Sequence, residues 1–183
     1  YPGAPGGGGN DHRRAWIGLR ARASDVSNTT DRSTFSATTL RADLGTIKGP
    51  KNGPGSKVYI ASGVSILALM GLDEMRTIDK FGPNASFVRG SVGKVWGIDV
   101  VESQVLTSDL NASGVYDGVT TTKTGLLLAN RGRFKRFRRR GVRLRSQPDI
   151  TRGIVHMVAD RRNGFATIDG GSTKNVHFAY NMS

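Results

Sequence analysis

The sequence predicts a mixed α+β fold, and three observations support this. The 183 residues suffice for one domain, or two small ones, with a hydrophobic core, and 25 glycines suit a turn-rich protein that contains strands. Residues 63–80 carry apolar side chains at helical spacing. The last third of the chain holds four strand-like segments separated by turn residues. We therefore expect helices in the first part and a β-sheet unit at the end.

Three segments have the features of helices. Asp11–Ala23 places apolar residues at helical spacing behind a potential aspartate cap. Ser36–Gly45 has Ser36 as an N-cap and Gly45 at the position just beyond the helix, where glycine is favoured. Gly63–Lys80 is the most regular of the three and is followed at once by a Phe-Gly-Pro stop signal.

Strands are expected wherever β-branched or apolar runs lie between turn residues. These segments are Lys57–Ala61, short pieces within Ser86–Ser103, Gly125–Asn130, Phe134–Arg145, Ile154–Arg161 and Asn175–Tyr180. Residues 1–10 and Thr107–Lys123 are predicted to be loops. The apolar runs Leu126–Ala129 and Ile154–Ala159 predict buried strands, which would hold the segment between them inside a folded sheet.

Several kinds of chemistry find no support in the sequence. The absence of cysteine removes disulfides, thiolate nucleophiles and cysteine-based metal sites. The three histidines and two glutamates show no metal-ligand spacing, and His156 is predicted to be a core histidine because its neighbours are apolar. The Gly/Lys clusters in 49–57 and 90–95 lack the spacing of a phosphate loop, and no serine-nucleophile motif occurs. We expect no enzyme activity, no cofactor, no bound metal and no membrane span.

Positive charge is concentrated in one block of the chain. Residues 131–162 hold twelve Lys or Arg and two acids, so ten of the thirteen excess positive charges lie there. The candidate inter-subunit charge cluster within this block is Arg131, Arg133, Lys135, Arg136, Arg138, Arg139 and Arg140.

Three interpretations of this block stay open on the residues alone. It could bind nucleic acid, with Phe134 and Phe137 interleaved among the cations, although a separation of three puts them on opposite faces of a regular strand. It could be an inter-subunit interface, because arginine pairs bidentately with carboxylates. It could also be a solvated strand face, as the alternation in 142–145 suggests.

The order of several motifs resembles the major capsid proteins of tailed bacteriophages. The segments that carry the resemblance are Arg14–Arg20, Thr77–Gly82, Gly90–Ser103, Leu126–Phe134 and Val158–Phe165, with matching spacing over about residues 13–180. That family has the Hong Kong ninety-seven fold, with an axial domain, a peripheral domain, an extended loop and an N-terminal arm.

The resemblance implies a division of this chain into three parts. Residues 1–35 would be a linker and short helix, 36–123 the axial domain, and 124–183 the peripheral-domain sheet. An N-terminal arm, an extended loop and a long spine helix are not found in this sequence, so we expect the C-terminal part of a capsid subunit.

The resemblance also implies a structural function. We expect pentamers and hexamers of an icosahedral shell that encloses double-stranded DNA without sequence-specific binding, in the virion and, during assembly, in the host cytoplasm. Minor capsid or decoration proteins and a portal are further expected partners. The alternatives are an encapsulin-type compartment shell, which shares the fold, and a basic nucleic-acid-binding protein.

Overall fold

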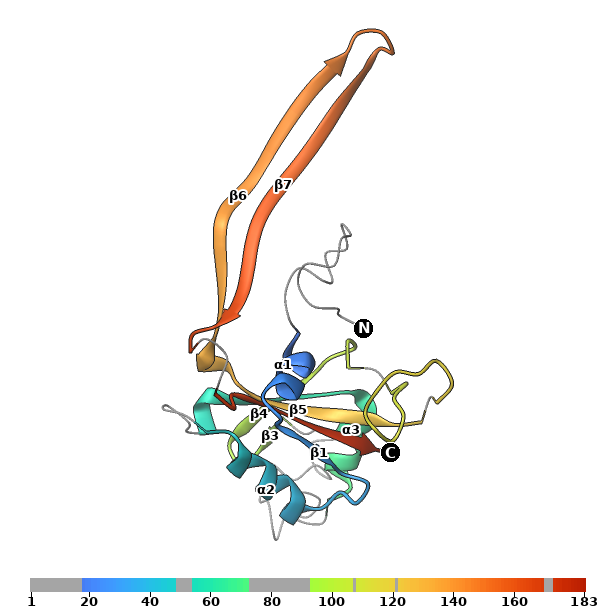
Figure 1. The fold of residues 1–183 in the computed structure, drawn as a ribbon, viewed down its shortest axis with the longest axis vertical. Coiled ribbons are helices and arrows are strands. Elements are labelled where there is room, and N and C mark those ends of the chain that lie inside the picture. The colour runs from blue at the N-terminus through green and yellow to red at the C-terminus, as the bar shows by residue number, and fades with distance from the viewer. Residues whose placement is uncertain (1–17, 49–53, 73–92, 107, 121, 170–172) are drawn as a thin grey trace.

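A computed structural model describes residues 18–48, 54–72, 93–106, 108–120, 122–169 and 173–183. Within these ranges the chain has two parts, a compact part built on a six-stranded sheet and a long two-stranded hairpin that projects away from it (Figure 1). Helices and a mixed sheet together confirm the α+β prediction.

The compact part is organised around one mixed sheet. In spatial order its strands are β1 (Thr29–Asp31), β8 (Val176–Met182), β5 (Thr124–Asn130), β2 (Lys57–Ala61), β4 (Ile98–Glu102) and β3 (Lys94–Val95). β1 runs parallel to β8 and β2 parallel to β4, while the other neighbours are antiparallel. The predicted strand at Lys57–Ala61 has the same bounds in the structure.

Helices cover both faces of the central strands. α1 (Leu19–Asp25) packs on one face, where Leu127 and Ala129 of β5 are buried. α2 (Ala37–Thr46) and α3 (Gly63–Met70) pack on the other, where Leu126 and Leu128 are buried. Successive side chains of a strand point to opposite faces, so a continuous apolar run is needed to fill both cores.

The helix ends agree in part with those predicted from the sequence. The Ser36 hydroxyl accepts a 3.2 Å hydrogen bond from the Thr39 amide, and the Thr39 hydroxyl accepts one of 2.9 Å from the Ser36 amide. Gly45 was placed wrongly, since it lies inside α2 and Ile47 is the C-cap. α3 ends at Met70 rather than at Lys80, with Gly71 as its C-cap. Residues 73–80, like 11–17 of the first predicted helix, lie outside the described part of the chain.

A buried carboxylate ties α2 to the sheet. Asp43 is 1% exposed, and both of its oxygens accept hydrogen bonds from Arg32, one of them from Nε at 3.2 Å. Nε2 of the buried His177, on β8, lies 3.1 Å from Asp43 Oδ1. Burial acts to raise the pKa of Asp43, but His177 and Arg32 outweigh it, so the pKa is lowered. The anionic form of Asp43 is therefore stabilised in the folded state.

Two predictions about the last third of the chain were wrong. Residues 124–183 do not form one sheet, because β5 and β8 pair within the six-stranded sheet, whereas among the described strands the two strands of the hairpin pair only with each other. The run Ile154–Ala159 is exposed in the hairpin rather than buried. A short apolar run shows that a strand is present, but it cannot show whether another element covers that strand. The domain names given to 36–123 and 124–183 stay predictions.

We expect Asp43→Asn to destabilise the fold by about 3 kcal/mol, because it leaves the Arg32 guanidinium largely buried without its counter-charge. Urea unfolding measures the loss. The matched control is Asp25→Asn, whose half-exposed carboxylate lies 3.7 Å from Arg22 and should contribute less than about 0.5 kcal/mol. Equal losses in the two variants would contradict a special role for Asp43.

The lowered pKa of Asp43 also predicts a pH dependence of stability. A carboxyl with a depressed folded pKa contributes stability above its unfolded pKa of about 3.9, and this is lost as pH falls through the folded value. The difference in unfolding free energy between the unsubstituted chain and Asp43→Asn should therefore shrink below about pH 4. Urea titrations at several pH values test this, and a difference that grows on acidification would contradict it.

Candidate assembly surface

The arginine block forms the long hairpin. β6 (Phe134–Asp149) and β7 (Ile154–Thr167) are antiparallel over 16 and 14 residues, and in Figure 1 they extend well beyond the compact part. The strands are joined by a turn in which Gly153 has a φ of +66°, a conformation that glycine adopts without steric cost. The length exceeds the Phe134–Arg145 and Ile154–Arg161 predicted from sequence.

The base of the hairpin is anchored to the compact part. A 3₁₀ turn, η4 (Arg131–Arg133), leads from β5 into β6. The rings of Phe134 and Phe165 stack with centroids 5.5 Å apart, and the guanidinium of Arg22, on α1, donates a 3.3 Å hydrogen bond to the Thr167 hydroxyl. Beyond this base, the ribbon is exposed along most of its length.

Two irregularities in register determine which side chains share a face. Pairing shifts between Arg138 and Arg140 and again between Arg140 and Arg143, so β6 carries one extra residue at each place. Residues directly opposite each other in an antiparallel pair lie on the same face, so the register divides the ribbon into two faces.

One face, here named the arginine face, is rich in cations. It consists of Lys135, Phe137, Arg140, Arg143, Arg145, Gln147 and Asp149 on β6, with Ile154, His156, Val158, Asp160 and Arg162 on β7. Arg140 donates to Asp160 in the hairpin's ion pair, and it also lies directly opposite Arg162. Like charges in directly opposite positions are destabilising, so this arrangement is maintained at a cost.

The other face is apolar in its distal half, here named the apolar face. Its members are Leu144, Ser146 and Pro148 on β6 and Val155, Met157 and Ala159 on β7. Leu144 is 75% exposed and Met157 is 78% exposed. Burying such a side chain is worth about 1.5–3 kcal/mol relative to leaving it in water, so this face is a candidate interaction surface.

The structure does not bring the predicted charge cluster together on one face. Arg131 remains at the base, where it donates a 2.8 Å hydrogen bond to the Gly55 carbonyl and lies 3.5 Å from Asp99. Arg133 belongs to the same 3₁₀ turn. Lys135 and Arg140 lie on the arginine face, Arg136 and Arg138 lie on the opposite side, and Arg139 is the extra residue of the first register shift. Successive side chains of a strand point to opposite faces, so β6 divides these cations, and the register shift at Arg139 changes which of them share a face.

The aromatic residues of the block behave as their spacing predicts. Phe134 is half-buried and shares a face with Arg136, whereas Phe137 is 51% exposed on the arginine face. The histidine prediction was wrong, because His156 is exposed. Of the two histidines in the described part of the chain, the buried one is His177, which the sequence did not single out. Both lie in strand-like apolar surroundings, so no local signal distinguishes them.

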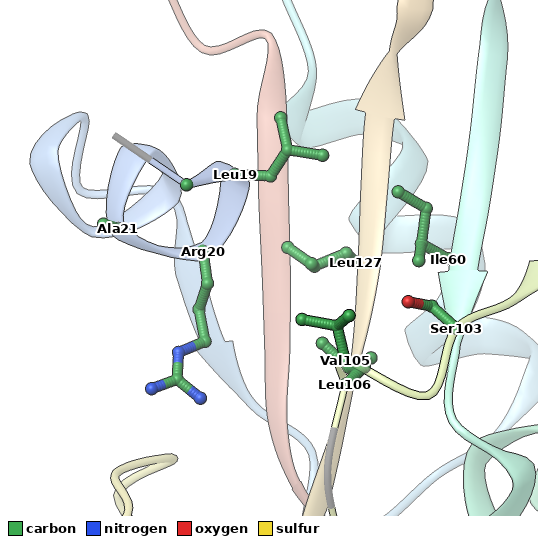
Figure 2. Close-up of a pocket in the computed structure, with 9 residues that line it drawn as sticks. Leu19, Arg20, Ala21, Ile60, Ser103, Val105, Leu106 and Leu127 are labelled. Carbon is green, nitrogen blue, oxygen red and sulfur yellow. The ribbon is translucent and has the colours of Figure 1, made fainter. Parts of the chain in front are cut away.

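A cavity of about 380 Å³ lies between α1 and the sheet, as Figure 2 shows. Its lining is mainly aliphatic, including Leu19, Ile60, Val105 and Leu127, and Arg20 is the ionisable side chain among its lining residues. Across the described ranges, no three Asp, Glu, His or Cys residues gather in a way that could hold a metal ion. In the same ranges, no helix has the length and apolar character needed to cross a membrane.

Comparisons with known proteins identify the fold. No protein-family model and no curated protein sequence matches the chain. A solved structure from mycobacterium phage Che8 is similar with a TM-score of 0.57 and 12% identity, covering 88% of this chain and 56% of that one. A chain from the mature capsid of bacteriophage PhiM1 gives a TM-score of 0.46 and 14% identity, covering 88% of this chain and 45% of that one.

The chain thus spans about half the length of the solved chains that it matches. The similarity to the Che8 chain over 88% of the present sequence shows that this chain shares its fold with a phage chain, in agreement with the fold that the sequence resemblance implied.

Proposed function

We propose that this chain is part of a major capsid protein, which assembles with copies of itself into the pentamers and hexamers of an icosahedral shell around double-stranded DNA. The observation that carries the proposal is the projecting hairpin with an exposed apolar face, in a chain that shares its fold with a solved chain from mycobacterium phage Che8. Its place is then the virion capsid, reached by assembly in the host cytoplasm. Minor capsid or decoration proteins and a portal are proposed as further partners.

The physical properties of the hairpin support an assembly role. An isolated two-stranded ribbon is at best marginally stable in water, and the described strands pair β6 only with β7. Contact with another subunit would bury the apolar face and support the ribbon at the same time. A shell made of many copies repeats this contact at each equivalent position, so a modest free energy per contact is sufficient.

Two cations of the charge cluster would take part in the same contact with a neighbouring subunit. Arg136 and Arg138 lie on the side of the ribbon that carries the apolar face, nearer its base. Both are exposed, and neither forms an ion pair with a described residue. We assign them to carboxylates of a neighbouring subunit, because the planar guanidinium pairs bidentately with carboxylate groups.

Electron microscopy of the purified full-length protein tests the assembly proposal directly. Closed shells with five-fold and six-fold capsomers are expected at moderate salt. A protein that stays monomeric or dimeric across a range of salt concentration and pH would overturn the proposal.

Two adjacent residues of β7 provide a matched test of the apolar face. Met157→Ser removes an exposed side chain from the apolar face, whereas Val158→Ser removes one that is 59% exposed on the arginine face. We expect Met157→Ser to raise the concentration needed for assembly by about tenfold, since about 1.4 kcal/mol of lost contact free energy corresponds to a factor of ten. Light scattering against protein concentration measures the threshold.

Val158→Ser should leave the threshold within about twofold of that of the unsubstituted protein. Circular dichroism should show that both variants keep their fold, because both side chains are exposed in the single chain. Identical thresholds for the two variants would show that the apolar face is not the contact surface.

A further inference from the structure

The arginine face carries more positive charge than the chain itself neutralises. Its five cations are Lys135, Arg140, Arg143, Arg145 and Arg162, against the two carboxylates of Asp149 and Asp160, which leaves an excess of three. Asp160 is engaged by Arg140, and Asp149 accepts backbone hydrogen bonds from the turn, from Thr151 at 3.1 Å and Arg152 at 3.3 Å.

We propose that the arginine face binds the phosphate backbone of duplex DNA without regard to sequence. This goes beyond the proposed function, because a shell can enclose DNA without any cationic surface that holds it. The proposed site is centred on Arg143, Arg145 and Arg162, which are exposed and form no ion pair with any described residue.

The placement of these arginines favours an extended anion. Arg143 and Arg145 alternate along β6, so their attachment points are about 6.6–6.8 Å apart, and Arg162 continues the row toward the base from the paired strand. A row of cations matches the continuous charge of a nucleic-acid backbone, and displacement of condensed counterions supplies the free energy of binding. An anion at this row would also relieve the repulsion between Arg140 and Arg162.

A second copy of this chain is a poorer partner for this face. Outside the hairpin, the described residues hold eleven Lys and Arg against eight Asp and Glu, so the described compact part is itself positive by three. Asp43, one of those eight acids, is buried beside Arg32 and is not available on the surface. Charge complementarity therefore favours a phosphate polyanion over the compact part of a neighbour at this face, whereas Arg136 and Arg138 lie on the side where burial of the apolar face would bring single carboxylates of a neighbour close.

The two faces of the ribbon allow both contacts at once. Leu144 and Met157 lie on one face, while Arg143, Arg145 and Val158 lie on the other. A neighbouring subunit on the apolar face would leave the arginine face open. The two interactions can therefore be removed separately by substitutions at adjacent positions.

The test is the salt dependence of DNA binding by unassembled protein, held below its assembly threshold. The probe is a short fluorescent DNA duplex of random sequence, followed by anisotropy over a range of salt concentrations. Removing two phosphate contacts with Arg143→Gln and Arg145→Gln should weaken binding and reduce the slope of log affinity against log salt by about 2. Replacing the same two residues by lysine should largely keep the slope, because charge is retained.

The matched control removes the same charge from the compact part. Arg41→Gln with Lys48→Gln changes two exposed cations on α2 and just after it, and should leave the slope within about 0.5 of that of the unsubstituted chain. If the control variant reduced the slope as much as the Arg143 and Arg145 variant does, only net charge would matter, and the proposal would be overturned. An unchanged slope in the Arg143 and Arg145 variant would also overturn it.

Competition distinguishes nucleic acid from an acidic protein partner. Polyglutamate at the same charge concentration should displace the duplex much less effectively than unlabelled DNA does. Equal displacement would assign the arginine face to a carboxylate-rich surface instead. Because shells are scored separately by electron microscopy, failure of DNA binding leaves the assembly proposal intact, and failure of assembly leaves the DNA proposal testable.

Discussion

The compact part of the chain depends on the burial of β5 from both sides. All seven residues of this strand are buried, and its neighbours β2 and β8 contribute Tyr59, Val176 and Phe178 to the two cores. Removing one methylene group from water is worth about 0.8 kcal/mol, so a strand covered on both faces contributes far more than one with a wet face. Helices can pack on both faces of the sheet because β5 presents apolar side chains to both faces.

Several polar groups buried in this core contact one another. The Ser62 hydroxyl, which caps α3, lies 2.8 Å from the Thr124 hydroxyl at the start of β5, and the Ser65 hydroxyl donates a 2.9 Å hydrogen bond to the Gly125 carbonyl. On the same side of the sheet, Asp43 links α2 to β8. A buried polar group without a partner costs about 1–3 kcal/mol, so these contacts fix the helices against particular residues of the sheet.

Local sequence signals predicted where helices and strands occur better than they predicted which of these elements are buried. The strand at Lys57–Ala61 and the cap at Ser36 depend on residues close in the chain, and both were predicted correctly. Leu126–Ala129 and Ile154–Ala159 look alike as sequences, yet the first is buried and the second exposed. Their difference depends on which distant segments pack against them, and a single sequence does not contain that information. The same limit applies to the cations of residues 131–140, because their division between the base and the two faces of the hairpin depends on pairing with β7.

Because of the two register shifts, some positions of the hairpin tolerate the loss of a residue and others do not. Arg139 is an extra residue opposite a regular part of β7, so its loss would restore plain pairing and leave each distal side chain on its present face. The loss of one residue from the regular stretch between Arg143 and Asp149 would instead turn over the rest of that strand, exchanging charged and apolar positions. Related chains can therefore vary in length at the shifts, whereas elsewhere in the ribbon additions and deletions must come in pairs to preserve its two surfaces.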